Sequence, residues 1–123
     1  MQHNVKSYKE LLVWQKSIDL VVQIYLLTEE FPKEEIYGLT SQIRRASVSI
    51  SSNIAEGRYR GTKADFVRFL RMSYGSGAEL ETQLEIAKRL LKTRSLNYNK
   101  VEGLLEEVMK MLNVIIKKLE TKS

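Results

Sequence analysis

Ten basic and aromatic side chains in the second half of the chain could bind phosphate groups. Lys and Arg attract the phosphate backbone of nucleic acids, and an aromatic ring can stack on a base. Cations near the carboxyl ends of helices also offset the helix dipole, so a purely structural role stays open. The candidates form two groups: Arg58, Tyr59, Arg60, Lys63, Arg68 and Arg71, and then Lys88, Arg89, Lys92 and Arg94.

The uneven distribution of charge supports the same interpretation. The formal net charge is +5, and it divides into −1 over residues 1–57 and +6 over residues 58–123. Such an asymmetry favours a polyanionic partner, RNA or DNA, although a solvated basic surface would give the same composition. The sequence has no zinc-finger or RNA-recognition signature. We therefore expect binding that depends on charge and shape rather than on base sequence.

The sequence offers little for catalysis or for binding a metal or cofactor. It contains no Cys and a single His, His3. The serines at positions 47, 49, 51 and 52 therefore lack a histidine that could activate them as nucleophiles. The segment around Gly75 and Gly77 lacks the Lys-Ser/Thr of a phosphate-binding loop, and no Glu-x-x-His pairs suggest a di-iron centre. We expect a protein that is not an enzyme and that holds no cofactor or metal.

Residues 42–57 place small and polar side chains where a helical core usually holds Leu. Small side chains let helices approach closely, and buried polar groups need hydrogen-bond partners. Asn53 and Glu56 share a face and could form a polar contact point at the end of a channel. We expect instead that Asn53 hydrogen-bonds to another helix and that Glu56 pairs with a neighbouring arginine. Gly75 and Gly77 are expected to approach this serine-rich segment closely.

Arg44 and Arg45 are adjacent on the same predicted helix, so their side chains point about 100° apart. They could bind phosphate, because the guanidinium group offers a planar fork of donors. Alternatively, they could form salt bridges with carboxylates at Glu35, Glu79 or Glu81. We expect such a salt bridge for at least one of the two arginines.

Hydrophobic periodicity predicts an all-α chain. Pro32 separates the first two helices, Gly57 is the expected carboxyl cap of the second, and Thr62 with Asp65 resembles a capping box for the third. Long helices joined by short loops predict one domain, residues 1–123, folded as an antiparallel up-down-up-down four-helix bundle. The expected helices span about 8–30, 34–56, 62–92 and 97–120.

The first predicted helix is apolar on two faces, which suggests self-association. Leu11, Trp14 and Ile18 mark one face, and Leu20 and Ile24 belong to the other. A helix that is apolar on two sides is usually buried on two sides, which is more than one small core requires. We expect Leu20, Ile24 and the small-residue stripe of the next two helices to lie at contacts between identical chains.

The location follows from what the sequence lacks. No segment approaches the ~20 apolar residues that a membrane span needs, and the first residues lack the apolar centre of a signal peptide. The absence of Cys is consistent with a reducing compartment. We expect a soluble, cytoplasmic protein with no membrane partner.

Several motifs, in a defined order, resemble those of a known family. They are Leu-Val-Trp-Gln-Lys (12–16), Phe-Pro-Lys-Glu-Glu-Ile-Tyr-Gly-Leu (31–39), Gln-Ile-Arg-Arg-Ala (42–46), Ser-Ile-Ser-Ser-Asn-Ile-Ala-Glu-Gly (49–57) and Gly-Ser-Gly-Ala-Glu-Leu-Glu (75–81). The chain resembles the four-helix-bundle proteins encoded in 23S rRNA intervening sequences, which are related to the accessory variability determinant of diversity-generating retroelements. The likeness extends from Tyr8 to about Leu119.

The resemblance implies an antiparallel bundle that assembles into a homopentameric barrel. It also implies nucleic-acid binding and, for the retroelement branch, a reverse transcriptase as partner. Two functional hypotheses follow. The chain is either a non-enzymatic, homo-oligomeric accessory protein that binds nucleic acid through a basic surface, or a scaffold for protein–protein assembly whose positive charge is incidental.

Overall fold

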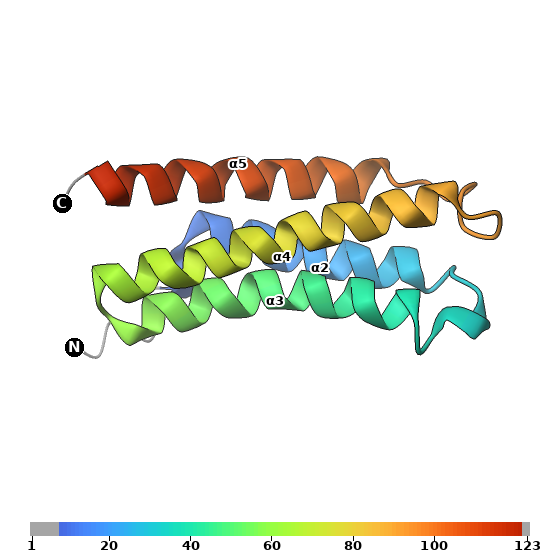
Figure 1. Cartoon of the computed structure of the whole chain (residues 1–123), viewed down its shortest axis with the longest axis horizontal. Helices are drawn as coiled ribbons and strands as arrows, with labels where there is room; N and C mark the ends of the chain where they lie inside the picture. Colours follow the sequence, from blue (N-terminus) through green and yellow to red (C-terminus); the bar gives the residue numbers. More distant parts are fainter. Residues whose placement is uncertain (1–7, 122–123) are drawn as a thin grey trace.

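A computed structural model describes residues 8–121, and over this range the chain forms helices and no strand. None of the described helices combines the length and apolar character that a membrane span would need. In chain order, the elements are α2 (Leu12–Thr28), the short 3-10 helix η1 (Lys33–Glu35), α3 (Leu39–Arg60), α4 (Lys63–Arg89) and α5 (Asn99–Thr121) (Figure 1).

The four long helices lie side by side along the length of the molecule (Figure 1). Consecutive helices are connected at alternate ends, so the α3–α4 turn and the carboxyl end of α5 lie at the same end. Helix α2 contacts α3 and α5, and α4 contacts the same two helices. Each long helix therefore buries one face against two neighbours.

The core is an apolar interior to which all four long helices contribute. Each fully buried Leu or Ile stabilises the folded state by roughly 1.5–3 kcal/mol relative to an exposed one. Fully buried members include Leu20, Ile24, Ile50, Leu70, Leu84 and Leu112. Leu20 and Ile24 were expected at a contact between chains, and that placement is wrong, because both side chains have no exposed surface within the protomer.

The small and polar stripe of α3, residues 42–57, also makes contacts with the other helices of the same chain. The hydroxyls of Ser17 and Ser51 join α2 to α3 with a buried hydrogen bond of 2.8 Å. Ser73 of α4 donates to the carbonyl of Ile50 at 2.8 Å. Polar atoms on this stripe are thus satisfied partly across helix contacts and partly within α3, where Ser47 donates to the carbonyl of Arg44 at 2.8 Å.

Two expectations about glycines near the middle of α4 fail. A Cβ at Gly77 would collide with the Met109 side chain of α5, not with the serine-rich face of α3. A Cβ at Gly75 would meet nothing within 4 Å. Only Gly77 therefore marks a close approach, and its neighbour is the fourth long helix.

The helix ends differ from the predicted ones for identifiable reasons. Helix α3 begins at Leu39 rather than near residue 34, because residues 33–35 form η1 and Gly38 has a non-helical backbone (φ −117°, ψ −108°). It continues through Gly57, and Gly61 caps it with φ 86°. Positive φ is favourable for glycine, which has no Cβ.

The other ends are closer to expectation. The hydroxyl of Thr62 accepts a hydrogen bond from the backbone N–H of Asp65 at 3.1 Å, which confirms Thr62 as the cap of α4. Helix α4 ends at Arg89, three residues early. The first predicted helix is interrupted by the extended backbone of Leu11, so α2 begins at Leu12.

Candidate nucleic-acid interface

The first basic group lies around a two-residue turn between α3 and α4. Gly61 and Thr62 form this turn, and the N–H of Gly61 donates to the carbonyl of Arg58 at 3.3 Å. The helices remain close beyond the turn because Gly57 has no side chain there. A Cβ at Gly57 would lie 2.6 Å from the Cβ of Phe69. The turn therefore brings the basic residues of both helix ends to one end of the molecule.

Two aromatic rings hold three of the arginines in place. The guanidinium carbon of Arg58 lies 5.6 Å from the centre of the Phe66 ring. Those of Arg60 and Arg68 lie 4.9 Å and 4.6 Å from the centre of the Phe69 ring. Such cation–π contacts stabilise by about 0.5–1 kcal/mol at exposed sites, and they leave the N–H donors at the edge of the guanidinium able to contact phosphate.

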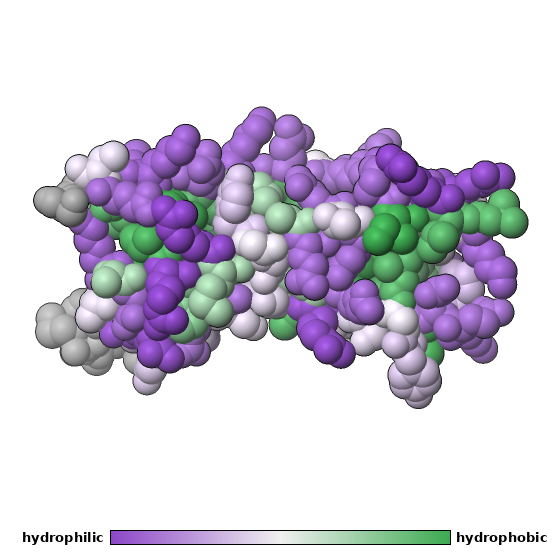
Figure 2. Space-filling view, in the orientation of Figure 1, coloured by the Kyte–Doolittle hydropathy of each residue, from purple (hydrophilic) through white to green (hydrophobic). Residues whose placement is uncertain are grey.

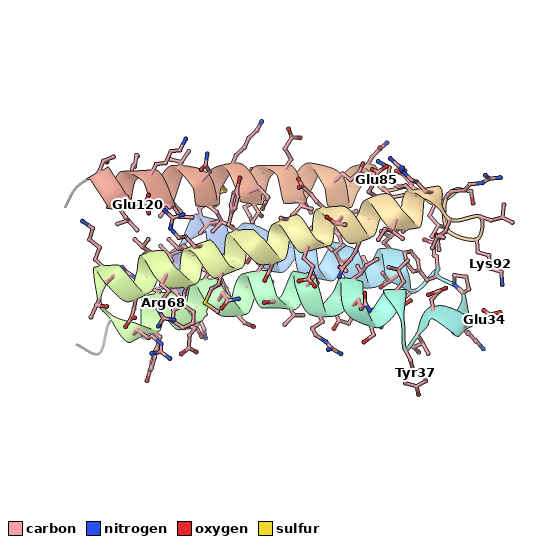
Figure 3. The ribbon with its side chains drawn as sticks, in the orientation of Figure 1. Glu34, Tyr37, Arg68, Glu85, Lys92 and Glu120 are labelled. Carbon is pink, nitrogen blue, oxygen red and sulfur yellow. The ribbon has the colours of Figure 1, made fainter. Side chains whose placement is uncertain are left out.

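Acidic side chains pair with some of these cations. Arg60 lies 3.1 Å from Glu56, and Arg68 lies 3.2 Å from Asp65. Arg71 pairs with Glu120 near the carboxyl end of α5, at the end where Figure 3 also places Arg68. The side chains of Lys63 and Tyr59 are exposed, and Tyr59 has 57% of its surface accessible. Ion pairing in this region is therefore partial.

The second basic group is at the opposite end and is surrounded by carboxylates. The amine of Lys88 lies 2.7 Å from Glu102, Arg89 lies 2.9 Å from Glu85, and Lys92 lies 3.6 Å from Glu34. Figure 3 shows Lys92, Glu34 and Glu85 at this end. Arg94 is exposed on the connection that follows α4.

These ion pairs shift the titration of their members. A hydrogen bond with Glu102 raises the pKa of the Lys88 amine. A hydrogen bond from Arg89 lowers the pKa of the Glu85 carboxyl. A backbone hydrogen bond and the charge of Lys92 lower the pKa of the Glu34 carboxyl. All three groups are therefore fully charged at neutral pH.

A count of charges separates the two ends. We call the end with the α3–α4 turn the basic end; within residues 8–121 it has eight basic and four acidic side chains, a net charge of +4. They are Lys9, Arg58, Arg60, Lys63, Arg68, Arg71, Lys117 and Lys118, with Glu10, Glu56, Asp65 and Glu120. The opposite end has six of each sign, a net charge of zero. They are Lys33, Lys88, Arg89, Lys92, Arg94 and Lys100, with Glu29, Glu30, Glu34, Glu35, Glu85 and Glu102.

The structure gives Arg44 and Arg45 other partners than the expected carboxylates. Arg44 donates to the hydroxyl of Thr28 at 2.8 Å, and its guanidinium carbon lies 4.5 Å from the centre of the Tyr25 ring. Arg45 donates to the hydroxyl of Ser41 at 3.4 Å. The expected salt bridge to a carboxylate is therefore wrong for both arginines as the described residues are arranged.

The remaining polar candidates are distributed over α3 and α4. The amide of Asn53 donates to the carbonyl of Ser49 at 2.9 Å, so its bond is within α3 and not to another helix. Glu56 pairs with Arg60, as expected. Glu79 and Glu81 are exposed, and Glu79 lines a shallow hollow that Arg45 also lines. These residues do not converge on one site.

Sequence reasoning missed the part that Phe69 plays in this interface. A signal was available, because Phe66 and Phe69 are three residues apart and basic residues flank both. Residues three apart lie on neighbouring positions of one helix face. Within residues 8–121, no group of three or more His, Asp or Glu side chains is placed to hold a metal ion, and His3 lies outside that range.

Comparison with known proteins identifies the family. No curated protein matches the chain significantly. The model of the 23S rRNA-intervening sequence protein family matches residues 9–114, which covers α2 to α4 and most of α5. The chain therefore belongs to the 23S rRNA-intervening sequence protein family.

Proposed function

We propose that this chain is a non-enzymatic, homo-oligomeric accessory protein, each subunit an antiparallel up-down-up-down four-helix bundle, that binds nucleic acid through its basic end. The observation that carries the proposal is the difference between the two ends. Both ends are rich in Lys and Arg, but the basic end keeps a net charge of +4 while the opposite end is neutral. A polyanion is attracted to the former and not to the latter.

The geometry of the basic end suits phosphate contacts along a strand. Arg58, Arg60 and Arg68 lie over aromatic rings, which limits the freedom that each side chain would lose on binding. Lys63 extends from the first residue of α4, and the exposed ring of Tyr59 can stack on a base. Neither RNA nor DNA is favoured by these contacts, because they engage phosphate and ring faces.

Oligomerisation would multiply these weak contacts. A pentamer, the assembly that the resemblance implies, would present five basic ends, and linked sites bind a long polyanion more tightly than separate ones. Exposed apolar side chains on the outer face of α2, Val22 and Leu26, are half exposed and available for contact with another subunit. We place the assembly in the cytoplasm.

The same outer face of α2 supports a second candidate function, a scaffold for protein–protein assembly. Val22, Tyr25 and Leu26 follow helical spacing and are 51%, 40% and 50% exposed. The protein partner would then be a reverse transcriptase, as the resemblance to the accessory protein of diversity-generating retroelements implies. In this alternative the basic end has no ligand.

Matched charge variants at the two ends test the proposal. One triple variant combines Arg58→Gln, Arg60→Gln and Lys63→Gln, and the control combines Lys88→Gln, Arg89→Gln and Lys92→Gln. Each removes three positive charges. We expect the first triple to weaken binding to a fluorescent single-stranded RNA or DNA by about tenfold or more at about 50 mM salt, and to lower the salt dependence, because each lost phosphate contact removes about 0.7 from the slope. The control should change affinity by about twofold at most.

Fluorescence anisotropy measures both quantities, with circular dichroism and light scattering to verify fold and particle size. Equal weakening by both triples would show that only net charge matters and would overturn the site. Absence of binding by the unmodified protein at about 50 mM salt would favour the scaffold alternative.

A further inference from the structure

A hollow at the amino end of α3 lies far from the basic end and has no part in the proposal above. It is lined by Tyr25, Ile36, Thr40, Ser41, Arg44 and Arg45. All four lining residues that belong to α3 carry a hydroxyl or guanidinium group, and they lie within two turns of Leu39, the first residue of the helix. Polar groups of this kind, gathered in a concave site, are typical of anion binding.

The two arginines of this hollow have no carboxylate as a counter-charge in the described part of the chain. Arg44 is half buried, and its bonds go to Thr28 and to the carbonyl of Tyr25. Arg45 contacts only the hydroxyl of Ser41. Four other arginines of the molecule pair with Glu or Asp: Arg60, Arg68, Arg71 and Arg89. The positive charge of Arg44 is therefore held by neutral partners alone, and Arg45 is exposed, so an anion in the hollow would supply the counter-charge that both guanidinium groups lack.

The carboxylate that precedes α3 does not neutralise Arg44 or Arg45. Glu35, the last residue of η1, directs its Oε1 to the backbone N–H of Leu39 at 3.3 Å. This carboxylate acts as the cap of α3, since Gly38 at the cap position has no side chain to offer. The backbone N–H groups of Thr40 and Ser41 follow in the first turn of α3. The helix itself supplies no acceptor for N–H groups at these positions.

Thr40 gives a second observation at the same hollow. Only 4% of its surface is exposed, and its Oγ1 has no hydrogen-bond partner. A buried hydroxyl without a partner destabilises the folded state, so such groups are rare in proteins. Thr40 also lines the hollow, so its unpartnered hydroxyl belongs to a residue that borders the space an anion would occupy.

We propose that this hollow binds a phosphate monoester, the terminal phosphate of a nucleotide or of a nucleic-acid strand. Arg44 and Arg45 supply charged donors, and Thr40 and Ser41 supply hydroxyl and amide donors. The Ser41 hydroxyl accepts from Arg45 and keeps its own proton for the ligand. Two guanidinium groups match the dianionic charge of a monoester better than the single charge of an internal phosphodiester. The site stands independently of the basic end.

Inorganic phosphate and adenosine 5′-monophosphate are the first probes, with adenosine as the control ligand. We expect both phosphates to shift the backbone amide resonances of Thr40 and Ser41 in ¹⁵N NMR titrations, and adenosine to leave them unchanged. Thr40→Val keeps the shape of the side chain and removes the hydroxyl. Because a hydrogen bond to a charged group contributes about 1.5–3 kcal/mol, Thr40→Val and Arg45→Gln should each weaken phosphate binding by about tenfold or more.

Lys33→Gln is the matched control, since Lys33 lies at the same end of the molecule but does not line the hollow. It should change phosphate affinity by about twofold at most, because only a screened charge is lost. Unshifted amides at Thr40 and Ser41 would overturn the proposal. Thr40→Val that stabilises the fold yet leaves phosphate affinity unchanged would overturn it equally, because the hydroxyl would then be a simple packing defect.

Oligonucleotides with and without a 5′-phosphate identify the source of the monoester. A higher affinity for the phosphorylated strand that persists in the Arg58→Gln/Arg60→Gln/Lys63→Gln protein assigns the hollow to strand ends. Equal affinity for both strands, with adenosine 5′-monophosphate still bound, assigns it to free nucleotides. The same triple variant should bind inorganic phosphate normally, so failure at the basic end and failure of the hollow are distinguishable.

Discussion

Three glycines within helices have different surroundings, and their differences decide what a methyl group would do. A Cβ at Gly57 would lie 2.6 Å from the Cβ of Phe69 and 3.4 Å from the Cα of Phe66, both close to the backbone of α4. A Cβ at Gly77 would meet the end of the flexible Met109 side chain. Gly75 is exposed and has free space around it.

Alanine at these positions should therefore give three different changes in the free energy of unfolding. Gly75→Ala should stabilise by about 0.5–1 kcal/mol, because alanine has the higher helix propensity. Gly57→Ala should destabilise by about 1–3 kcal/mol, because α3 and α4 must move apart. Gly77→Ala should fall between them. Urea denaturation measures all three, and a stabilising Gly57→Ala would contradict the close contact of α3 with α4.

The polar stripe of α3 shows which residue-level features the sequence could reveal. Its small side chains correctly indicated close helix packing, but the partners of its hydroxyls could not be read. Ser51 bonds to Ser17 and Ser73 bonds to the carbonyl of Ile50, over separations of 34 and 23 residues. Such pairs depend on how the helices are rotated about their axes, which periodicity alone does not fix.

The connection between α4 and α5 is an element held by side-chain bonds rather than by apolar packing alone. The hydroxyl of Thr93 donates to the carbonyl of Ala87 at 2.6 Å, and the hydroxyl of Tyr98 donates to the carbonyl of Thr93 at 2.8 Å. Thr93 and Tyr98 are 1% and 5% exposed. Burial raises the pKa of the Tyr98 hydroxyl above its usual value of 10.0.

The stability of this connection should consequently fall at alkaline pH. A pKa that is higher in the folded state means that the neutral form is favoured by folding. The stabilisation is complete below the unfolded pKa near 10.0 and is lost as pH rises toward the folded value. Tyr98→Phe should destabilise by about 1 kcal/mol at neutral pH, since one hydrogen bond is lost.

Thermal unfolding of both proteins from neutral pH to above 10 measures the effect, and the difference between them isolates Tyr98 from Lys88 and other groups that titrate there. The gap in melting temperature should narrow as pH rises through 10. A constant gap would show that Tyr98 does not titrate differently in the two states.

The four long helices could be predicted from the sequence, but several of their ends could not. Gly57 and Gly61 are both reasonable carboxyl caps of α3 by sequence. The structure uses Gly61, because Gly57 is needed where α3 contacts Phe69. The basic residues were likewise identified from the sequence. That carboxylates neutralise the second basic group could not be predicted, because two of its partners, Glu34 and Glu102, come from other elements.

On the surface of the whole molecule, exposed apolar side chains are grouped in patches apart from the charged ones. Figure 2 shows the face on which α4 lies in front; hydrophilic side chains predominate there, and hydrophobic ones form separate patches. Ile86, Leu90 and Leu91 are exposed toward the carboxyl end of α4, and Leu12, Val22 and Leu26 are exposed on α2. Isolated apolar side chains are ordinary on a protein surface, whereas a repeated face on one helix suggests a contact.

Self-association is expected to use the outer face of α2. Val22→Glu combined with Leu26→Glu should yield a folded monomer, because both side chains are half exposed in the protomer and a charge there disfavours only burial against another subunit. Leu20→Glu, two residues away but with no exposed surface, should instead unfold the chain.

Light scattering coupled to size-exclusion chromatography gives the mass of each variant, and circular dichroism reports whether the helices persist. A helical double variant with the mass of the unmodified oligomer would remove the outer face of α2 from the contact. A loss of helix in the double variant would mean that these side chains stabilise the protomer itself. A monomer that still binds RNA, more weakly and with a smaller salt dependence, would link assembly to the basic end, because each protomer would then contribute its phosphate contacts alone.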